Sequence, residues 1–481
     1  MMNIESLEPS ALWGEFAQIL DIPHPSYHEE RIREHLKAFA AKHELYCVED
    51  EAHNIYIRKG ASEGMSSHPG VVLQAHVDMV AQKNKATKFD FLTDPIKAYI
   101  EDGWLKAEGT TLGADNGIGV AAMLAVLADK SLKHPPLEAL FTASEEVGMD
   151  GAMGLKEDLL QGKTLLNLDS EEEGEFCIGC AGGLDLNITF DVEMRPTPSS
   201  DFVALRLVVN GLKGGHSGVQ IGEGFANANK ILFRFLRASK LDLLLCSIDG
   251  GGLRNAIPRE AEATILVHQD DIAKFYDDIN AYEHTIISEY KGVEDSISIK
   301  ATETAMPEEM IEEDAAACII WSVCGAPNGL QRLSPVIAGL PECSSNLARI
   351  YSEGSQVKLQ ALLRASQRSE KEALADSIAS VFELADADVE RSGGYEGWTP
   401  KADSAILEVA KDSYRSLFGT EPTVKSIHAG LECGMIGARY PEMDMISFGP
   451  TILSPHSPDE RVDIASVERF YAHLTDILSK L

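Results

Sequence analysis

Apolar and polar positions alternate with helical spacing at the start of the chain. An apolar residue recurs every three or four positions in residues 10–45, which predicts helical structure there. The apolar run at 117–127 is also long enough for a helix, and nearly all its positions are apolar, so we expect it to be buried. Short apolar runs that predict buried strands lie at 71–77, 137–143 and 164–168. Strands that alternate with helices indicate a largely parallel sheet covered by helices.

The pattern changes at Gly182-Gly183. Beyond it, period-2 alternation predicts half-exposed strands at 203–209, 261–267 and 357–363. Amphipathic helices are predicted between or after them, at 227–236, 272–290 and 370–384. The glycine-rich run 393–397 predicts a hinge, after which a helix at 404–417 and a strand at 443–448 restore the first pattern. We therefore predict an α/β fold with a mostly parallel sheet, formed by residues 1–183 and 395–481 and interrupted by an inserted α+β domain of residues 184–394.

Charge and composition exclude several classes of protein. The 481 residues carry a formal net charge of -34, and such a surface would repel a nucleic-acid backbone. The sequence contains no stretch of 18 uncharged apolar residues, so we predict no membrane span. The N-terminal residues lack the lysines and the apolar run of a signal peptide. Eight scattered cysteines, with Cys177 and Cys180 as one isolated CxxC pair, fit reduced thiols. We expect a soluble cytoplasmic protein that binds neither nucleic acid nor membrane.

The strand predicted at 71–77 ends in two residues with possible catalytic chemistry. His76 and Asp78 are two positions apart, so their side chains leave the same face of the strand. Open α/β sheets place their sites at the carboxyl ends of strands. A core histidine beside a turn aspartate explains these two residues equally well.

Acidic residues and a second histidine occupy comparable positions farther along the chain. Asp115 lies in a glycine-bracketed loop before the buried helix, where an aspartate can also act as an N-cap. Glu145 and Glu146 follow one predicted strand and Asp169 follows another, although pairs of acids are also common on surfaces. His456 lies in the loop Ser454-Pro455-His456-Ser457-Pro458.

Together these residues indicate a two-metal hydrolytic site. Zinc binds histidine nitrogen and carboxylate oxygen, and two metals about 3.5–4 Å apart require a bridging carboxylate. Catalysis also requires a base that is not itself a ligand, and the adjacent Glu145 and Glu146 can supply one of each.

The motifs resemble the zinc aminoacylase, carboxypeptidase and dipeptidase family of metallopeptidases, in matching order across nearly the whole chain. The segments that carry the resemblance are His76-Val77-Asp78, Gly113-Ala114-Asp115-Asn116-Gly117, Glu145-Glu146-Val147-Gly148, Leu168-Asp169 and Pro455-His456-Ser457. The resemblance implies a catalytic domain with two zinc ions per subunit, Co²⁺ or Mn²⁺ being possible substitutes, and an inserted lid domain. It implies His76 and Asp169 on one zinc, Glu146 and His456 on the other, Asp115 as the bridge, Glu145 as general base and Asp78 as the residue that orients His76.

Two further segments resemble the histidine-dipeptidase branch of this family. The acidic loop reads Asp115-Asn116-Gly117 where many relatives have Asp-x-Lys-Gly, and residues 428–434 are typical of the branch. The resemblance implies cleavage of dipeptides with a free C-terminal carboxylate, including Xaa-His and β-Ala-His, by a homodimer. It also implies that Gly430 and Glu432 help to bind the substrate.

The inserted domain has its own polar residues. Gly214-Gly215-His216-Ser217-Gly218 does not complete the G-x-S-x-G pattern of serine hydrolases, because position 219 is valine. By resemblance, His216 stabilises the oxyanion while Asn255 and Arg364 hold the substrate carboxylate, although a turn asparagine and a surface arginine would look the same. Other hydrolases have the same arrangement of site residues and stay open as alternatives: a tripeptidase, a carboxypeptidase and an N-acyl amino-acid deacylase. A binding protein without catalytic activity is a further alternative.

Overall fold

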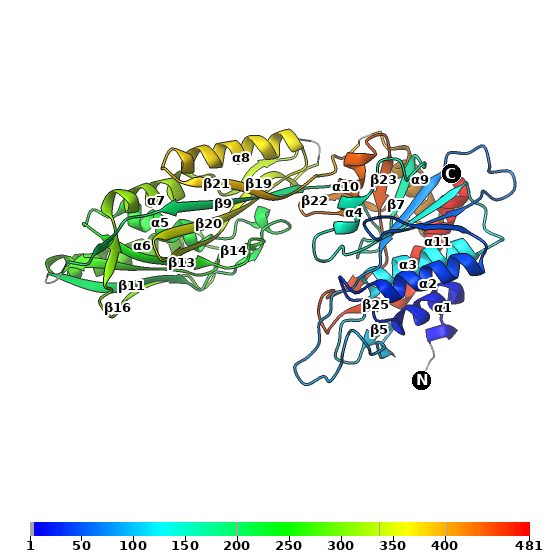
Figure 1. Ribbon diagram of the computed structural model, residues 1–481, viewed down its shortest axis with the longest axis horizontal. Helices are drawn as coiled ribbons and strands as arrows, with labels where there is room; N and C mark the ends of the chain where they lie inside the picture. The colour runs from blue at the N-terminus through cyan, green and yellow to red at the C-terminus, as the bar shows by residue number, and fades with distance from the viewer. Residues whose placement is uncertain (1–3, 199–200, 336, 402) are drawn as a thin grey trace. The chain divides into compact units, whose positions relative to one another are not determined.

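The chain folds into two units in the computed structural model, which describes residues 4–198, 201–335, 337–401 and 403–481 (Figure 1). Unit 1 comprises Met1–Gly179, Trp398–Ser426 and Leu431–Leu481, and unit 2 comprises Cys180–Gly397 and Ile427–Gly430. The segment 427–430, which we expected in the first domain, groups with unit 2. The backbone N–H of Ala181 explains this, since it donates to the carbonyls of Ile427 and Ala429.

Unit 1 is built on an eight-stranded sheet. The strand order is β1 (Tyr46–Glu49), β2 (Ile55–Lys59), β6 (Leu137–Thr142), β3 (Val71–His76), β7 (Thr164–Asn167), β23 (Asp444–Ser447), β8 (Glu175–Cys180) and β22 (Thr423–Ile427). The four central strands, β6, β3, β7 and β23, are mutually parallel, whereas β1, β2 and β8 pair antiparallel. The predicted α/β fold is confirmed. The carboxyl ends of the central strands therefore meet at one edge, where the candidate residues were expected.

Helices cover this sheet. They are α1 (Ser10–Leu20), α2 (Glu30–Lys42), α3 (Ala114–Ala128), α4 (Asp150–Gly154), α9 (Ala405–Phe418), α10 (Glu432–Arg439) and α11 (Ile464–Lys480). The prediction of helical structure throughout residues 10–45 was wrong, because α1 and α2 are separate helices. Pro23 and Pro25 lie between them, and proline removes a backbone N–H donor and clashes with the preceding turn.

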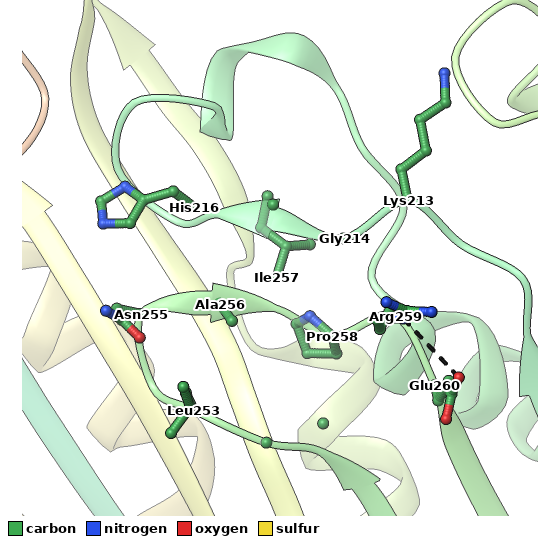
Figure 2. A pocket seen from close by; sticks show the side chains of 13 residues that line it. Lys213, Gly214, His216, Leu253, Asn255, Ala256, Ile257, Pro258, Arg259 and Glu260 are labelled. Carbon is green, nitrogen blue, oxygen red and sulfur yellow. Dashed lines mark ion pairs between the residues drawn. The ribbon is translucent and has the colours of Figure 1, made fainter. Parts of the chain in front are cut away.

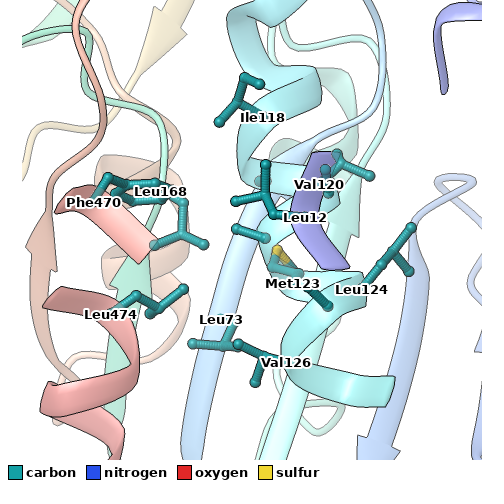
Figure 3. Close-up of a cluster of buried hydrophobic side chains, with 14 of the residues drawn as sticks. Leu12, Leu73, Ile118, Val120, Met123, Leu124, Val126, Leu168, Phe470 and Leu474 are labelled. Atoms are coloured by element: carbon teal, nitrogen blue, oxygen red, sulfur yellow. The ribbon is translucent and has the colours of Figure 1, made fainter. Parts of the chain in front are cut away.

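Helix α3 forms the centre of the unit 1 core (Figure 3). It is apolar on nearly every side, and it packs against both α1 and β3. Leu73 of β3, Leu12 of α1 and Leu474 of α11 are all fully buried in this cluster. Each such leucine contributes about 1.5–3 kcal/mol by leaving water. Leu73 points to this core, so its neighbours Gln74 and His76 are on the opposite face of the sheet from Leu73.

A second, four-stranded sheet joins distant parts of unit 1. Its order is β24 (Ile452–Leu453), β25 (Arg461–Asp463), β5 (Trp104–Ala107) and β4 (Ala98–Glu101). The antiparallel pairing of β25 with β5 brings the loop 454–460 beside the segment that leads into α3. This small sheet therefore fixes the part of the chain that contains His456.

Unit 2 is an antiparallel sheet with helices on one face. The strand order is β16 (Ser298–Glu303), β11 (Phe202–Asn210), β15 (Ala261–His268), β13 (Leu244–Gly251), β19 (Pro341–Glu353), β20 (Gln356–Ala365), β9 (Gly182–Asp191) and β21 (Asp388–Tyr395), and β18 (Gly329–Leu333) also pairs with β19. The helices that share its core are α5 (Ala228–Ala238), α6 (Ile272–Glu289), α7 (Glu313–Gly325) and α8 (Arg368–Glu383).

Two short strand pairs complete unit 2, β10 (Met194–Pro196) with β17 (Glu309–Ile311) and β12 (Gly215–His216) with β14 (Ala256–Ile257). The predicted hinge at 393–397 begins inside β21, where the register shifts between Ser392 and Tyr395. Within the described parts of both units, we find no helix with the length and apolar character needed to span a membrane.

Candidate active site

His76 is the last residue of β3 and is almost fully buried. Its Nδ1 atom lies 3.0 Å from the backbone carbonyl oxygen of Asp78, and 3.4 Å from Oδ1 of the same residue. Nδ1 therefore donates its proton to Asp78, so Nε2 is the nitrogen that faces the neighbouring carboxylates and can bind a metal ion once its proton is lost. The hydrogen bond from Nδ1 also fixes the direction of the ring.

Asp115 lies between two histidines at the start of α3. Its Oδ1 atom is 3.2 Å from Nε2 of His76, and its Oδ2 atom is 3.2 Å from Nε2 of His456. Each carboxylate oxygen thus faces a different imidazole, although the histidines are 380 positions apart in the sequence. A carboxylate arranged in this way can bridge two cations, one beside each histidine.

Two more carboxylates complete the cluster. Asp169 Oδ1 lies 3.3 Å from Nε2 of His76, and Glu146 Oε1 lies 2.9 Å from Nε2 of His456. Ligand atoms of His76, Asp115 and Glu146 are all within 4.8 Å of one another. Glu146 Oε1 is buried and accepts no hydrogen bond of proper geometry, despite its short distance to His456. The short distance places both atoms where they could ligate one ion.

The cluster has more negatively charged groups than positively charged ones. A hydrogen bond to Asp115 and the nearby negative charge of Glu146 raise the pKa of His456 to about 11. Burial raises the pKa of Glu146 and of Asp169, because it penalises their charged forms. Three carboxylates surround two imidazoles, so negative charge is in excess unless protons or metal ions balance it. Two nitrogen donors and three carboxylates match the ligand preference of zinc.

Glu145 stands beside these residues with a free carboxylate. Its side chain has no hydrogen-bond partner among the residues that the structure describes. Burial and the nearby negative charges of Asp169, Glu432 and Glu146 raise its pKa well above the usual range. A carboxylate with a raised pKa and no fixed partner can accept and return a proton near neutral pH.

The carboxylate of Asp78 holds the turn that carries Glu145 and Glu146. Oδ1 accepts the backbone N–H of Glu145 at 2.9 Å, and Oδ2 accepts the N–H of Glu146 at 3.2 Å and the hydroxyl of Ser26 at 2.8 Å. The resemblance gave Asp78 the role of orienting His76. In the structure, the nearer acceptor for His76 Nδ1 is the backbone carbonyl of Asp78 at 3.0 Å, with Oδ1 of the carboxylate at 3.4 Å, and the same carboxylate also accepts hydrogen bonds from the base-bearing turn.

Glu432 is completely buried at the first residue of α10. Its Oε2 atom accepts hydrogen bonds from Gln74 at 2.6 Å and from Thr142 at 2.8 Å. Burial raises its pKa to about 8. Glu432 thus supports the face of the sheet that bears His76.

Sequence reasoning missed two glutamates near the cluster. Burial and the neighbouring carboxylates raise the pKa of Glu171 to about 8. Glu460 is buried and accepts backbone N–H groups from the segment that contains Asp115. Glu171 lies in the acidic run 171–173, which reads as a solvated surface, and Glu460 gives no sequence signal because its partners are more than 340 positions away.

In unit 2, His216 and Asn255 line a pocket of about 610 Å³ (Figure 2). His216 Nδ1 accepts the backbone N–H groups of Gly218 at 3.1 Å and Val219 at 3.2 Å. The ring therefore carries its proton on Nε2. Burial and the charge of Arg364 lower the pKa of His216, so its ring is neutral at pH 7 and can donate one hydrogen bond.

Arg364 is buried on β20, also in unit 2. Its Nη1 atom donates a 2.7 Å hydrogen bond to the hydroxyl of Tyr395, and its buried Nε atom has no partner in the described residues. A buried guanidinium with an unused donor has the chemistry for binding a carboxylate. Gly430 lies in the segment 427–430 of the same unit.

Known proteins resemble this chain over its whole length. The sequence model for Peptidase family M20/M25/M40 matches residues 72–480. The cytosol non-specific dipeptidase of Escherichia coli (strain K12) is 44% identical over 483 residues, covering 100% of this chain and 99% of the relative. The crystal structure of the aminoacylhistidine dipeptidase from Vibrio alginolyticus is 43% identical with a TM-score of 0.94, covering 100% of this chain and 98% of that one. A tripeptidase from Staphylococcus aureus shares the fold, with a TM-score of 0.57 at 16% identity and 98% coverage of both chains.

Proposed function

Since this chain belongs to Peptidase family M20/M25/M40, we propose that it is a hydrolase that cleaves dipeptides at a centre holding two zinc ions. One observation carries the proposal. The two oxygens of Asp115 face two different histidines, His76 and His456, each at 3.2 Å. An aspartate that only stabilises the fold does not require contacts with two histidines from distant parts of the sequence. A carboxylate that bridges two metals requires such an arrangement.

We assign His76 and Asp169 to one zinc and Glu146 and His456 to the other, with Asp115 shared. The close approaches within each histidine–carboxylate pair support this division. When bound, the zinc pair supplies Lewis acidity for the scissile carbonyl and lowers the pKa of water toward about 7. Co²⁺ and Mn²⁺ favour similar donors and can take the same positions.

Glu145 is the general base in this proposal. Its carboxylate has no hydrogen-bond partner among the described residues, and its raised pKa suits proton transfer near neutral pH. It takes a proton from the attacking water and returns that proton to the amine that leaves when the peptide bond breaks. Asp78 keeps Glu145 in place through the backbone hydrogen bond to the turn.

Residues of unit 2 recognise the substrate in this proposal. Arg364 and Asn255 bind the C-terminal carboxylate, and the buried guanidinium with its unused Nε donor supports this role. His216 donates its Nε2 proton to the oxygen of the tetrahedral intermediate, which fits its neutral tautomer. Gly430 contributes backbone contacts, whereas the buried Glu432 acts on the substrate only through the groups that it supports.

The full-length similarity to two dipeptidases favours a dipeptidase over the alternatives. Those alternatives are a tripeptidase, a carboxypeptidase and an N-acyl amino-acid deacylase. Xaa-His and β-Ala-His dipeptides are the substrates that we propose. The net charge of -34 and the reduced cysteines support a cytoplasmic location. On the basis of family resemblance, we also propose that the chain forms a homodimer.

The decisive experiment is hydrolysis of β-Ala-His by the purified chain, with and without a metal chelator, followed by addition of zinc. We expect activity that the chelator abolishes and zinc restores. Ala-Ala-Ala and N-acetyl amino acids, tested in parallel, should be cleaved slowly or not at all. Activity that persists in the chelator would refute the two-zinc mechanism. Preferential cleavage of the tripeptide or the N-acetyl compound would replace the dipeptidase assignment by that alternative.

A further inference from the structure

The buried carboxylate of Glu460 accepts four backbone hydrogen bonds. Oε2 accepts the N–H groups of Leu112 at 2.7 Å and Gly113 at 3.1 Å. Oε1 accepts those of Ala114 at 2.8 Å and Asp115 at 3.3 Å. Glu460 itself is only 2% exposed. All four hydrogen-bonding positions of one carboxylate are therefore used by four consecutive residues.

Among the residues that the structure describes, these four N–H groups have no other acceptor. They lie just before the regular part of α3, because Asp115 and Asn116 have non-helical backbone angles, so the hydrogen bonds within the helix do not satisfy them. Buried N–H groups left without partners would destabilise this segment. The conformation of residues 112–115 thus depends on a side chain from near the other end of the chain.

Glu460 belongs to the same loop as His456. The two residues are four positions apart, and the loop 454–460 is anchored between β24 and β25. The hydrogen bonds of Glu460 therefore connect the segment bearing Asp115 directly to the segment bearing His456. Asp115 Oδ2 and His456 Nε2, one on each of these segments, lie 3.2 Å apart.

We propose that Glu460 is a positioning residue of the metal centre, which fixes the bridging Asp115 relative to His456. This inference rests on the proposed function, because it assumes that these two residues bind metal. Groups that orient metal ligands typically change metal affinity by about 10–100-fold when they are replaced. In Glu460→Gln, an amide nitrogen would face two N–H groups, so two hydrogen bonds are lost and donors oppose donors.

The test measures zinc binding by the metal-free protein, by competition with a chromophoric chelator. We expect Glu460→Gln to bind zinc about 10–100-fold more weakly than the wild type while its circular dichroism spectrum remains native. Glu460→Asp keeps the charge, but its side chain is one methylene shorter. Its affinity for zinc should therefore lie between those of the wild type and Glu460→Gln. Glu138→Gln is the matched control. Glu138 is also a buried carboxylate that accepts a backbone N–H, from Gln161, and it lies at the far end of β6 from the cluster.

Three results would overturn the proposal. Zinc affinity of Glu460→Gln within about twofold of the wild type would exclude a positioning role, since such residues change affinity by tenfold or more. An equal loss in Glu138→Gln would show that general destabilisation explains the effect. In the metal-free wild type, rapid amide hydrogen exchange at residues 112–115 would show that Glu460 does not hold them, and this measurement does not require the variants to fold. If the wild type itself binds no zinc, the proposed function fails instead.

Discussion

The backbone N–H of Glu145 donates a 2.9 Å hydrogen bond to Oδ1 of Asp78. Oδ2 of the same carboxylate accepts the N–H of Glu146 at 3.2 Å. One aspartate at the end of β3 thus supports both the proposed base and an adjacent proposed ligand. Burial would raise the pKa of Asp78, but its hydrogen bonds with His76 and Ser26 and its interaction with the charge of His76 lower it, so the residue stays ionised.

Asp78→Asn should lower kcat by about 10–100-fold, because the amide nitrogen replaces one of the two oxygens that hold the turn. Zinc content should change little, since the hydrogen bond from His76 goes to the backbone carbonyl of residue 78. Steady-state kinetics and metal analysis of the purified variant test this. Ser26→Ala removes one hydrogen bond to the same carboxylate and should have a smaller effect. Loss of zinc from Asp78→Asn would indicate that the carboxylate orients His76 after all.

Glu145→Gln and Glu146→Gln should separate catalysis from metal binding at adjacent positions. Glu145→Gln should retain both zinc ions but lose about 10²–10⁴-fold in kcat, the usual contribution of a general base. Glu146→Gln should lose zinc, because an amide oxygen is a weaker ligand than a carboxylate. Metal content and kcat are measured for both. More than a few per cent of wild-type activity in Glu145→Gln would remove it as the base.

Zinc binding should release protons and become tighter as the pH rises. In the metal-free chain, His456 has a pKa of about 11 and is protonated at neutral pH, whereas a histidine ligand must be neutral. The free state therefore holds a proton that the bound state lacks, and affinity should increase about tenfold per pH unit for each proton released. Calorimetric titration in buffers of different ionisation enthalpy counts these protons. Absence of proton release between pH 6 and pH 8 would contradict the electrostatics described for the cluster.

Arg364→Ala should raise KM for β-Ala-His by about 10–100-fold, because a hydrogen bond to a charged group contributes about 1.5–3 kcal/mol. The wild type should also discriminate against β-Ala-His amide, which lacks the carboxylate. Arg349→Ala is a suitable control, since Arg349 lies in the same unit but pairs with Asp249. If the wild type cleaves the amide and the free acid equally well, Arg364 does not bind a carboxylate.

Unit 1 should lose stability in acid because of His473. This residue is buried against Phe176, and burial lowers its pKa to about 4. Below pH 6.5 the unfolded chain takes up a proton that the folded chain does not, so the contribution is lost as the pH falls toward 4. It amounts to about 3 kcal/mol. Urea unfolding of the metal-free wild type and His473→Phe at pH 7 and pH 4 should show a smaller decrease for the variant. Equal decreases would exclude His473 as the cause.

Much of unit 1 was predictable because its central strands are buried on both faces. Apolar runs of this kind are visible in the sequence, and the strands predicted at 137–143 and 164–168 correspond to β6 and β7 within one residue. The four-stranded sheet was missed. Its strands are two to four residues long and partly polar, and its two local strand pairs, β4 with β5 and β24 with β25, join each other only through contacts between residues more than 350 positions apart. Short strands of this kind produce no detectable periodicity.

The candidate site was only partly visible for a related reason. His76, Asp115, Glu146, Asp169 and His456 carry chemistry that the sequence reveals through residue type and local glycines or prolines. The roles of Asp78 and Glu460 depend on which backbone N–H groups meet their carboxylates. Those contacts arise from tertiary structure, so residue type alone gives no sign of them.

Strand β23, residues 444–447, lies between β7 and β8 in the middle of the unit 1 sheet. During synthesis from the N-terminus, a ribosome must therefore complete all of unit 2 before the strand that fills this position emerges. Until then β7 has an unpaired edge, and edges of this kind are sites of incorrect pairing. His456 follows β23 by nine residues, so the proposed metal centre is complete only after the sheet has closed. A nascent chain that ends before His456 consequently lacks part of the proposed centre, and we expect it to cleave no peptides until this residue has been synthesised.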